Sequence, residues 1–268
     1  MGFFIQKIVK DNQVLNELSL NPGIKFLVVP LGPGKDEPIT HAVYPTVFVE
    51  TEEQSSVNLL DHFWTAKKKC VEICGVNEDK GFFTARSLNT FTLKKNSELE
   101  HIPRTFKVAV ITLSDRASAG EYNDLSGAFL KDEIYRYFLQ KKYSCSIEYD
   151  LICDDEHMLV KLLDEYLQTN VDLIVTTGGT GIGPRDITVP VVQKMIDYEL
   201  PGIMDLVRIK YGMQNPAAVL SRSIAGIANK TLIFCLPGSL KAVKEYWSEI
   251  STILLHAYYM LYAIDKHS

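Results

Sequence analysis

The sequence lacks the basic excess that a nucleic-acid-binding protein needs. Its 268 residues include 28 lysines and arginines against 33 aspartates and glutamates, a formal net charge of −5 at pH 7. Proteins that grip nucleic acid neutralise its phosphates with clustered basic side chains and release counterions in doing so. Because no such excess is present, nucleic acid is not an expected partner.

Long hydrophobic runs are also missing. The longest apolar stretch, Ile250 to Ile264, is interrupted by Ser251, Thr252 and His256. A membrane-spanning helix needs about 20 consecutive apolar residues, so this stretch predicts a buried terminal helix instead. The first residues lack the charged start, apolar core and small-residue cleavage site of a signal peptide. We therefore expect a cytoplasmic protein with no membrane partner.

Cysteines are few and odd in number, which excludes a disulfide framework. The five thiols are spread along a chain with 46% hydrophobic residues, a usage typical of a reducing compartment. Cys70 and Cys74 lie four residues apart in a predicted helix, and no nearby His or Cys pair completes a zinc site. They are interpreted as small semi-buried residues. The alternative is a reactive thiol whose pKa is lowered by the lysines at 67–69.

The second half of the chain alternates regularly between strand-like and helix-like segments. A continuous apolar run predicts a buried strand at Phe106–Leu113, and further strands are predicted at Cys145–Ile152, Val171–Thr177 and Thr231–Leu236. Apolar residues at helical spacing predict helices at Asp124–Gln140, Glu156–Leu167, Val189–Tyr198, Ile203–Tyr211 and from Leu240 onward. This alternation predicts an α/β fold, a mostly parallel sheet with helices on both faces. Ligands of such sheets bind at the carboxyl ends of the strands.

The first hundred residues have a different rhythm. Short β-type runs recur at Phe3–Val9, Lys25–Leu31, Thr46–Glu50 and Phe82–Leu93. One helix is predicted from Ser56 to Ile73 with Ser56 as its cap, and turn residues at Gly32–Pro38 predict a loop. A polar segment at Asn96–Arg104 marks the boundary. The sequence therefore predicts a small β-rich accessory domain over residues 1–103 and an α/β domain over 104–268.

A glycine-rich loop follows the strand predicted at Val171–Thr177. It reads TTGGTGIGPRDIT, with four glycines in six positions. Glycine permits positive φ and lets backbone N–H groups approach an anion closely. The loop has neither the Gly-Lys-Ser/Thr ending of a Walker loop nor the GxGxxG dinucleotide spacing. Arg185, Asp186 and Thr188 add a cation for phosphate, a carboxylate for a metal and a hydroxyl, which distinguishes this loop from a simple turn.

Other polar motifs stand at the remaining strand ends. Ser114 and Asp115 follow the first strand of the α/β half, and Asp154 follows the second. On composition alone Asp154 is favoured as the cap of the next helix, as Asp124 is for its own.

Two further motifs complete the set. In LSRS, Ser221 and Ser223 place hydroxyls around Arg222. Pro237-Gly238-Ser239 ends the last strand and opens the terminal helix, whose N-terminus favours anions.

Together these motifs resemble the molybdopterin adenylyltransferases, the bacterial MogA/MoaB type and the gephyrin G-domain. SDRASAGEYNDLSG, TTGGTGIGPRDIT, ELPG, LSRS and LPGS stand in the family's order and spacing over about residues 106–264. The resemblance implies a three-layer α/β/α domain, the molybdopterin-binding fold, that assembles as a homotrimer. It implies Mg²⁺-dependent adenylylation of molybdopterin by ATP with release of pyrophosphate, and the molybdate-insertion enzyme as a partner.

The same resemblance implies roles for individual residues. Asp154 and Asp186 match the catalytic, metal-holding carboxylates. The ligand-binding residues it implies are Ser114, Asp115, Gly178, Gly179, Thr180, Gly181, Arg185, Thr188, Ser221, Arg222, Pro237, Gly238 and Ser239. Such a reaction needs no Ser, Cys or His nucleophile, because the substrate's own phosphate attacks. Catalysis then consists of positioning and charge neutralisation.

The sequence departs from the family pattern at three places. Val189 rather than proline follows Thr188, Cys235 replaces the usual Asn, and Cys153 replaces the usual Pro. Cys235 leaves one polar contact of the family in question.

Alternative readings stay open for both halves. The second half could be a non-catalytic molybdopterin-binding or scaffold protein. A MoeA-type molybdate-insertion enzyme is less favoured, since the Ser114-Asp115-Arg116 motif is absent there. In the first half, Leu18–Phe26 and Gly81–Arg86 faintly resemble a MOSC domain. The alternative is an accessory module with no chemistry of its own.

Overall fold

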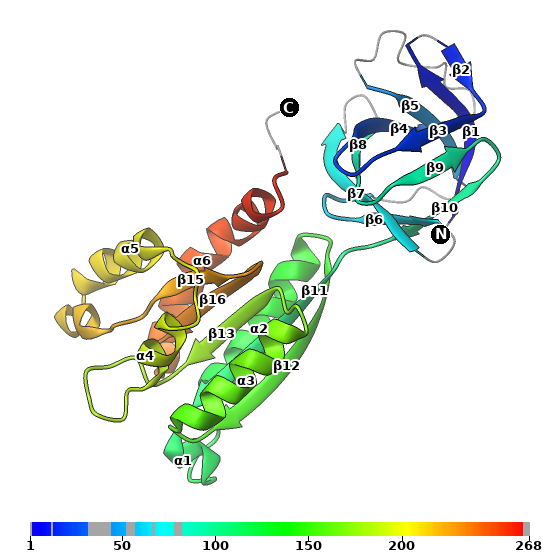
Figure 1. Ribbon diagram of the computed structural model, residues 1–268. Coiled ribbons are helices and arrows are strands. Elements are labelled where there is room, and N and C mark those ends of the chain that lie inside the picture. Colours follow the sequence, from blue (N-terminus) through cyan, green and yellow to red (C-terminus); the bar gives the residue numbers. More distant parts are fainter. Residues whose placement is uncertain are drawn as a thin grey trace. The chain divides into compact units, whose positions relative to one another are not determined.

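The computed structural model describes residues 2–11, 13–31, 44–51, 57–65, 68–77 and 82–264. The chain divides into two compact units, Thr105–Leu261 and Met1–Arg104 with Tyr262–Ser268 (Figure 1). The residues after Leu261 therefore group with the first unit, whereas the sequence placed them in the second. Arg86 explains part of this grouping, because its guanidinium donates a 2.8 Å hydrogen bond to the Tyr262 carbonyl.

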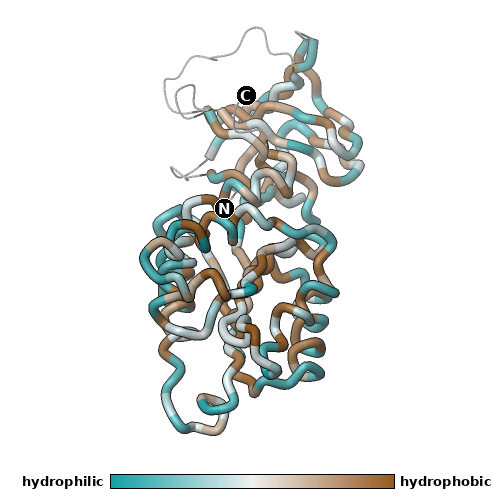
Figure 2. Tube along the Cα trace, turned by 90° about the vertical axis from the view of Figure 1, so that its left-hand side faces the viewer, coloured by the Kyte–Doolittle hydropathy of each residue, from teal (hydrophilic) through white to brown (hydrophobic). Residues whose placement is uncertain are grey.

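Hydrophobic and hydrophilic residues alternate along the traces of both units (Figure 2). Within the described residues, no helix is long and apolar enough to cross a membrane. The terminal helix that carries the longest apolar stretch buries Val243, Ile250 and Leu254 among its apolar residues, as expected for a helix packed on a sheet.

The first unit is built from strands. They are β1 (Gly2–Lys10), β2 (Gln13–Leu15), β3 (Glu17–Leu20), β4 (Lys25–Leu31), β5 (Thr46–Thr51), β6 (His62–Thr65), β7 (Lys68–Asn77), β8 (Phe82–Ser87), β9 (Phe91–Lys94) and β10 (Glu98–Ile102). The main sheet has the order β10-β6-β7-β8-β4-β5-β1-β2, and β10 also pairs with β1. Seven strands thus close into a ring, with β2 attached to β1 and a separate β3–β9 pair.

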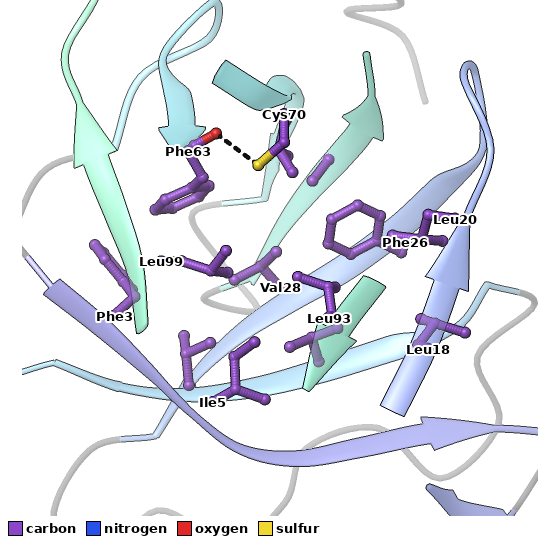
Figure 3. Close-up of a cluster of buried hydrophobic side chains, with 14 of the residues drawn as sticks. Phe3, Ile5, Leu18, Leu20, Phe26, Val28, Phe63, Cys70, Leu93 and Leu99 are labelled. Carbon is purple, nitrogen blue, oxygen red and sulfur yellow. Dashed lines mark hydrogen bonds between the residues drawn. The ribbon is translucent and has the colours of Figure 1, made fainter. Parts of the chain in front are cut away.

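Inward-facing side chains of this ring form its core (Figure 3). Phe3 and Ile5 of β1 meet Phe26 of β4 and Phe63 of β6. The rings of Phe3 and Phe63 lie 5.0 Å apart in an edge-to-face arrangement. Alternate residues of a strand share one face, which is why positions 3 and 5 are buried together.

The prediction of a helix over Ser56–Ile73 is wrong. Ser56 lies outside the described residues, as does the predicted loop Gly32–Pro38. The described part forms β6 and β7, and Leu60, just before β6, has a φ of +68°, which no right-handed helix allows. Pairing with β8 and β10 outweighs the local helical spacing of the apolar residues.

Cys70 and Cys74 therefore lie in a strand and not in a helix. Both lie on β7 and are only 2% and 5% exposed. The Cys70 thiol donates to the Phe63 carbonyl at 3.2 Å (Figure 3). Burial raises the pKa of both thiols above the ordinary value. No helical face presents them, so the reactive-thiol alternative is not supported.

The predicted polar boundary at Asn96–Arg104 instead contains β10. His101 of this strand is buried, and its Nε2 lies 2.8 Å from Oδ2 of Asp61. The Arg104 N–H donates to the other oxygen of the same carboxylate at 2.8 Å. The segment that suggested a linker is therefore a paired strand with a buried histidine, and the second unit begins directly at Thr105.

The second unit alternates strands and helices. Its elements are β11 (Thr105–Leu113), α1 (Asp115–Ser118), α2 (Leu125–Gln140), β12 (Ser144–Ile152), α3 (Glu156–Gln168), β13 (Leu173–Thr177), α4 (Thr188–Gln193), β14 (Tyr198–Glu199), α5 (Pro201–Gly212), the 3-10 helix η1 (Pro216–Leu220), β15 (Ala225–Ala228), β16 (Thr231–Leu236) and α6 (Leu240–Leu261). The sheet order is β12-β11-β13-β16-β15-β14 (Figure 1). The first four strands pair in parallel, β15 pairs antiparallel with β16, and β14 pairs antiparallel with β15.

The sheet is thus mixed, and the α/β prediction holds with that correction. The predicted helix Val189–Tyr198 ends at Gln193, and its last residue belongs to β14. Both missed strands, β14 and β15, are short, and their pairing at the sheet edge is a tertiary feature without a local signal.

Helices cover both faces of the sheet. On one face Phe106 of β11 stacks on Phe138 of α2 at 4.5 Å and lies 4.8 Å from Tyr258 of α6. On the other face Ile111 shares a core with Leu159 of α3 and residues of α4. Burying one such side chain stabilises the fold by about 1.5–3 kcal/mol.

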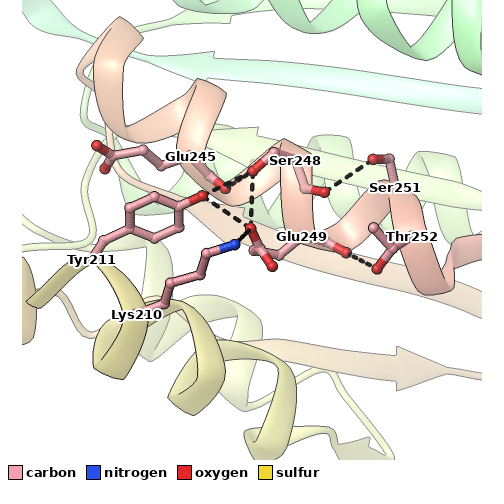
Figure 4. Close-up of polar contacts among 7 residues, drawn as sticks. All are labelled: Lys210, Tyr211, Glu245, Ser248, Glu249, Ser251 and Thr252. Atoms are coloured by element: carbon pink, nitrogen blue, oxygen red, sulfur yellow. Dashed lines mark hydrogen bonds and ion pairs between the residues drawn. The ribbon is translucent and has the colours of Figure 1, made fainter.

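Polar contacts fix α5 against α6 (Figure 4). Lys210 Nζ lies 2.7 Å from Glu249 Oε1, and the Tyr211 hydroxyl donates to the same oxygen at 2.9 Å. The hydrogen bond from Lys210 is the main cause that lowers the pKa of Glu249. The pair therefore stays ionised at neutral pH and locates α5.

Candidate functional site

A cavity of about 980 Å³ opens at the carboxyl ends of the parallel strands in the second unit. It is lined by residues 112–116, 122–126, 154, 177–186, 217, 220, 221 and 237–240. These segments follow β11, β12, β13 and β16 and include the N-termini of α2 and α6. The cavity is therefore where ligands of parallel α/β sheets bind.

The glycine loop is shaped by two positive φ angles. Gly178 has a φ of +102° and Gly179 of +64°. A Cβ on Gly178 would overlap the carbonyl oxygen of Leu113, well inside the 3.0 Å that real Cβ atoms keep. The Gly178 N–H also donates to the Leu236 carbonyl at 3.0 Å. Glycine is thus required where the ends of β11, β13 and β16 meet.

Thr188 is hydrogen-bonded to the backbone of this loop. It is fully buried, and its hydroxyl donates to the Gly178 carbonyl at 2.8 Å. Its N–H donates to the Gly179 carbonyl at 3.2 Å. Thr188 therefore does not line the cavity and shapes the loop instead.

Asp154 is free to face the cavity because a neighbour caps α3. Asp155, not Asp154, accepts the N–H of Met158 at 2.8 Å, so the capping interpretation of Asp154 is wrong. Burial raises the pKa of the Asp154 carboxyl, and the charges of Asp115 and Asp186 raise it further. Negative charge is therefore in local excess around Asp154.

Asp115 links three segments around the cavity. Its Oδ1 accepts the Asp154 N–H at 2.9 Å, and its Oδ2 pairs with Arg185 at 2.8 Å. Arg185 is well exposed, and its charge opposes the rise in the pKa of Asp154. One carboxylate thus ties the β11 and β12 loops to the glycine loop.

Asp186 is held inside the glycine loop. Its Oδ2 accepts the Gly183 N–H at 2.7 Å. A Cβ on Gly181 would lie 2.7 Å from the same oxygen, so the carboxylate packs against the loop backbone. Asp186 and Asp154 line the same cavity.

The N-termini of two long helices reach the cavity. Asp124 caps α2 through hydrogen bonds from the N–H groups of Ser126 and Gly127. Burial alone would raise the pKa of Asp124, but bonds from Thr112, Gly127 and Tyr149 outweigh burial and lower it. The Ser126 hydroxyl donates to the Gly238 carbonyl at 2.8 Å, which joins α2 to the start of α6. Aligned N–H groups at such ends attract anions; at α2 the Asp124 carboxylate already takes that place, which leaves the start of α6 for an anion in the cavity.

Among the lining residues that were not predicted as ligand contacts, three belong to one motif. Tyr122, Ser126 and Asp124 all lie within the SDRASAGEYNDLSG segment, where Asp124 was predicted only as a cap. The Tyr122 hydroxyl lies 2.8 Å from the Ser114 hydroxyl, and Arg116 lies over its ring at 5.4 Å. The available signal was that all three residues lie within this motif.

Of the predicted site residues, two do not line the cavity. Those that do are Ser114, Asp115, Asp154, Gly178, Gly179, Thr180, Gly181, Arg185, Asp186, Ser221, Pro237, Gly238 and Ser239. Thr188 and Arg222 lie behind the glycine loop. Arg222 donates from Nε to the Gly181 carbonyl at 2.6 Å and from Nη2 to the Asp186 carbonyl at 2.7 Å.

The carboxylates fit a magnesium ion that is shared with substrate. Within the described ranges, no group of three or more His, Cys, Asp or Glu side chains could hold a metal ion. Mg²⁺ in enzymes of phosphate chemistry is bound by one or two carboxylates, waters and substrate phosphates. Asp154 and Asp186, in an excess of negative charge, match that donor set.

A parallel-strand edge, a glycine loop, the N-terminus of α6 and two carboxylates on one cavity are features of α/β proteins that bind phosphate-rich ligands. Residues 109–257 match the family described as a probable molybdopterin binding domain, and the chain belongs to that family. The matched residues lie within the Thr105–Leu261 unit.

Individual relatives agree with the family. The molybdopterin adenylyltransferase of Helicobacter pylori (strain J99) is 40% identical over 146 residues, 53% of this chain and 80% of that protein. That of Pyrococcus furiosus is 37% identical, covering 58% of this chain and 93% of that protein. The crystal structure of the molybdopterin biosynthesis enzyme MoaB from Thermus thermophilus has a TM-score of 0.53 and 32% identity. It covers 61% of this chain and 99% of that one. The predicted family is thus confirmed.

Proposed function

We propose that the chain acts in molybdenum cofactor biosynthesis by transferring the adenylyl group of ATP to the terminal phosphate of molybdopterin. One observation carries the proposal: a glycine loop, the N-terminus of α6 and the carboxylates Asp154 and Asp186 converge on one cavity. The curated relatives are named for this nucleotidyl transfer.

The reaction requires no nucleophile from the protein. An oxygen of the molybdopterin phosphate forms a bond to the α-phosphorus of ATP, the bond to the β-phosphate oxygen breaks, and pyrophosphate leaves. Neither cysteine nor histidine is among the residues that line the cavity in the described structure. The chain's contribution is therefore to position two phosphate groups and offset their repulsion.

Backbone and side-chain donors meet that need. The glycine loop and the start of α6 offer N–H groups, and Arg185 offers a cation on a long exposed side chain. Asp154 and Asp186 would hold Mg²⁺, which when bound supplies positive charge to the phosphates. Burial and the neighbouring carboxylates both raise the pKa of Asp154, which supports this role because a bound divalent cation would offset the cost of the buried negative charge.

We further propose that the chain assembles as a homotrimer through an apolar face on α5 and η1. Leu206, Ile209 and Met213 at α5 are 54–86% exposed, and Val219 and Leu220 of η1 are each 56% exposed. An exposed apolar patch of this kind marks interaction surfaces. Ile209→Asp should shift the mass measured by light scattering from trimer to monomer. A wild-type chain that is monomeric would contradict the assembly.

The test of the activity is incubation with molybdopterin, ATP and Mg²⁺. Adenylylated molybdopterin and pyrophosphate should appear in equal amounts and only when Mg²⁺ is present. Tight molybdopterin binding without either product would instead favour a binding or scaffold role.

A further inference from the structure

Arg208 in α5 contacts the segment that lies behind the glycine loop. Its Nε donates to the Ser221 carbonyl at 3.1 Å and its Nη2 to the Ser223 carbonyl at 2.6 Å. A guanidinium is a rigid planar fork, so one side chain fixes both carbonyls that flank Arg222. Hydrogen bonds from a charged donor are about twice as strong as neutral ones.

Arg222 then makes the next set of contacts. Its guanidinium holds the carbonyls of Gly181 and Asp186, and its N–H donates to the Thr180 carbonyl at 2.8 Å. The bond to Asp186 is to the backbone of the residue whose carboxylate lines the cavity. Fixing that backbone fixes where the carboxylate points.

Polar contacts also connect the helix that carries Arg208 to α6. Lys210 and Tyr211, two and three residues after Arg208, are bound to Glu249 of α6 (Figure 4). Arg208 therefore extends from a helix that is itself anchored on the sheet-covering helix α6.

We propose that Arg208 is a positioning residue for Asp186, acting through the 221–223 segment and Arg222. It touches neither the cavity nor a substrate, so its effect is on the geometry and order of the glycine loop. The consequence for turnover rests on the proposed function, whereas the effect on loop order does not.

The decisive test measures loop order without turnover. Arg208→Lys keeps the charge but has no planar fork with donors on separate nitrogens to hold two carbonyls in this geometry, and Arg222→Lys makes the same change at the next contact. Asp205→Asn is the matched control, because Asp205 contacts Nη1 of Arg208 at 2.7 Å and its replacement leaves both carbonyl bonds intact. Amide hydrogen exchange of peptides covering 181–188 is compared with that of α3 peptides in the full chain.

Both lysine variants should exchange about tenfold faster over 181–188, equivalent to about 1.4 kcal/mol, with α3 unchanged. The control should match the wild type. Unchanged exchange over 181–188 in Arg208→Lys would overturn the proposal. An equal increase in α3 would also overturn it, since Arg208 would then be a general structural residue.

A kinetic cycle tests the series of contacts itself. If Arg208 acts through Arg222, the double lysine variant should lose about as much kcat as the more impaired single variant, with the KM for ATP nearly unchanged. Additive losses would show independent roles and overturn the series. A wild-type chain that makes no product would refute the proposed function. The hydrogen-exchange result would still show whether Arg208 orders the glycine loop.

Discussion

Replacing Gly178 with alanine should destabilise the second unit more than any other single methyl group added to its glycine loop. Gly178 has a φ of +102°, a region that side chains with a Cβ rarely adopt. The added carbon would overlap the Leu113 carbonyl oxygen. That oxygen belongs to backbone at the end of β11, so no side-chain rotation relieves the overlap.

Two effects combine in this variant. Holding a non-glycine residue in a sparsely populated φ region costs on the order of 1–3 kcal/mol. Moving the loop away from Leu113 also strains the 3.0 Å bond from Gly178 N–H to Leu236, and a hydrogen bond contributes about 0.5–1.5 kcal/mol. We expect a loss of about 2–4 kcal/mol, a large fraction of the roughly 5–15 kcal/mol that stabilises a domain.

A matched control separates strain from overlap. Gly120 has a φ of +78°, but a Cβ there would meet no atom within 4 Å. Gly120→Ala should therefore lose only the strain, about 1 kcal/mol. Both variants are made with Trp64→Phe, which leaves Trp247 of α6 as the single tryptophan and reports on the second unit alone.

Urea titration followed by Trp247 fluorescence gives the free energy of unfolding for each variant. Gly178→Ala should lose at least about 1 kcal/mol more than Gly120→Ala, the difference that the overlap adds to the strain. Equal losses would refute the claim that the close approach of β11 and β13 is what requires glycine.

Three further outcomes follow from the structure. The pKa of Asp154 is raised in the folded chain, so the stability that its protonated carboxyl contributes is present at low pH and lost as pH rises through the folded pKa. Asp154→Asn should therefore melt at a higher temperature than wild type at pH 7 and at the same temperature near pH 4. A lower melting temperature of the variant at pH 7 would contradict the charge excess. A fragment of Thr105–Leu261 should fold alone and adenylylate free molybdopterin within about tenfold of the full chain, whereas an insoluble fragment would refute its independence. Thiol reagents should leave Cys70 unmodified in the folded chain, because burial raises its pKa, and rapid labelling measured by mass spectrometry would contradict this.

The sequence predicts the second unit well because its signals are local. The runs that became β11, β13 and β16 are buried on both faces, so continuous apolar stretches identify them. Loops at the ends of these strands must then meet, which brings Asp154 and Asp186 to one cavity.

Other features depend on contacts that no local pattern reveals. The segment around Leu60 has helical spacing, but pairing within the closed ring makes the residues after it a strand pair. The sequence predicted Asp154 as the cap of α3, whereas Asp155 is the cap. The extended backbone angles of Asp155 place its carboxylate against the first turn of the helix, and the sequence does not reveal such angles. The resemblance of the LSRS motif implied a ligand role for Arg222, and no local pattern showed that its guanidinium donates to the loop carbonyls of Gly181 and Asp186.

The most direct test of the central claim compares wild type with Asp186→Asn in the presence of molybdopterin, ATP and Mg²⁺. The substituted side chain keeps nearly the same shape and can still contact the Gly183 N–H, but it removes the charge that would hold the cation. The wild type should release pyrophosphate as adenylylated molybdopterin forms, and the folded variant should be slower by about a thousandfold or more, about 4 kcal/mol of barrier. Turnover by Asp186→Asn close to that of the wild type, or a wild type that binds both substrates and forms no product, would contradict the account.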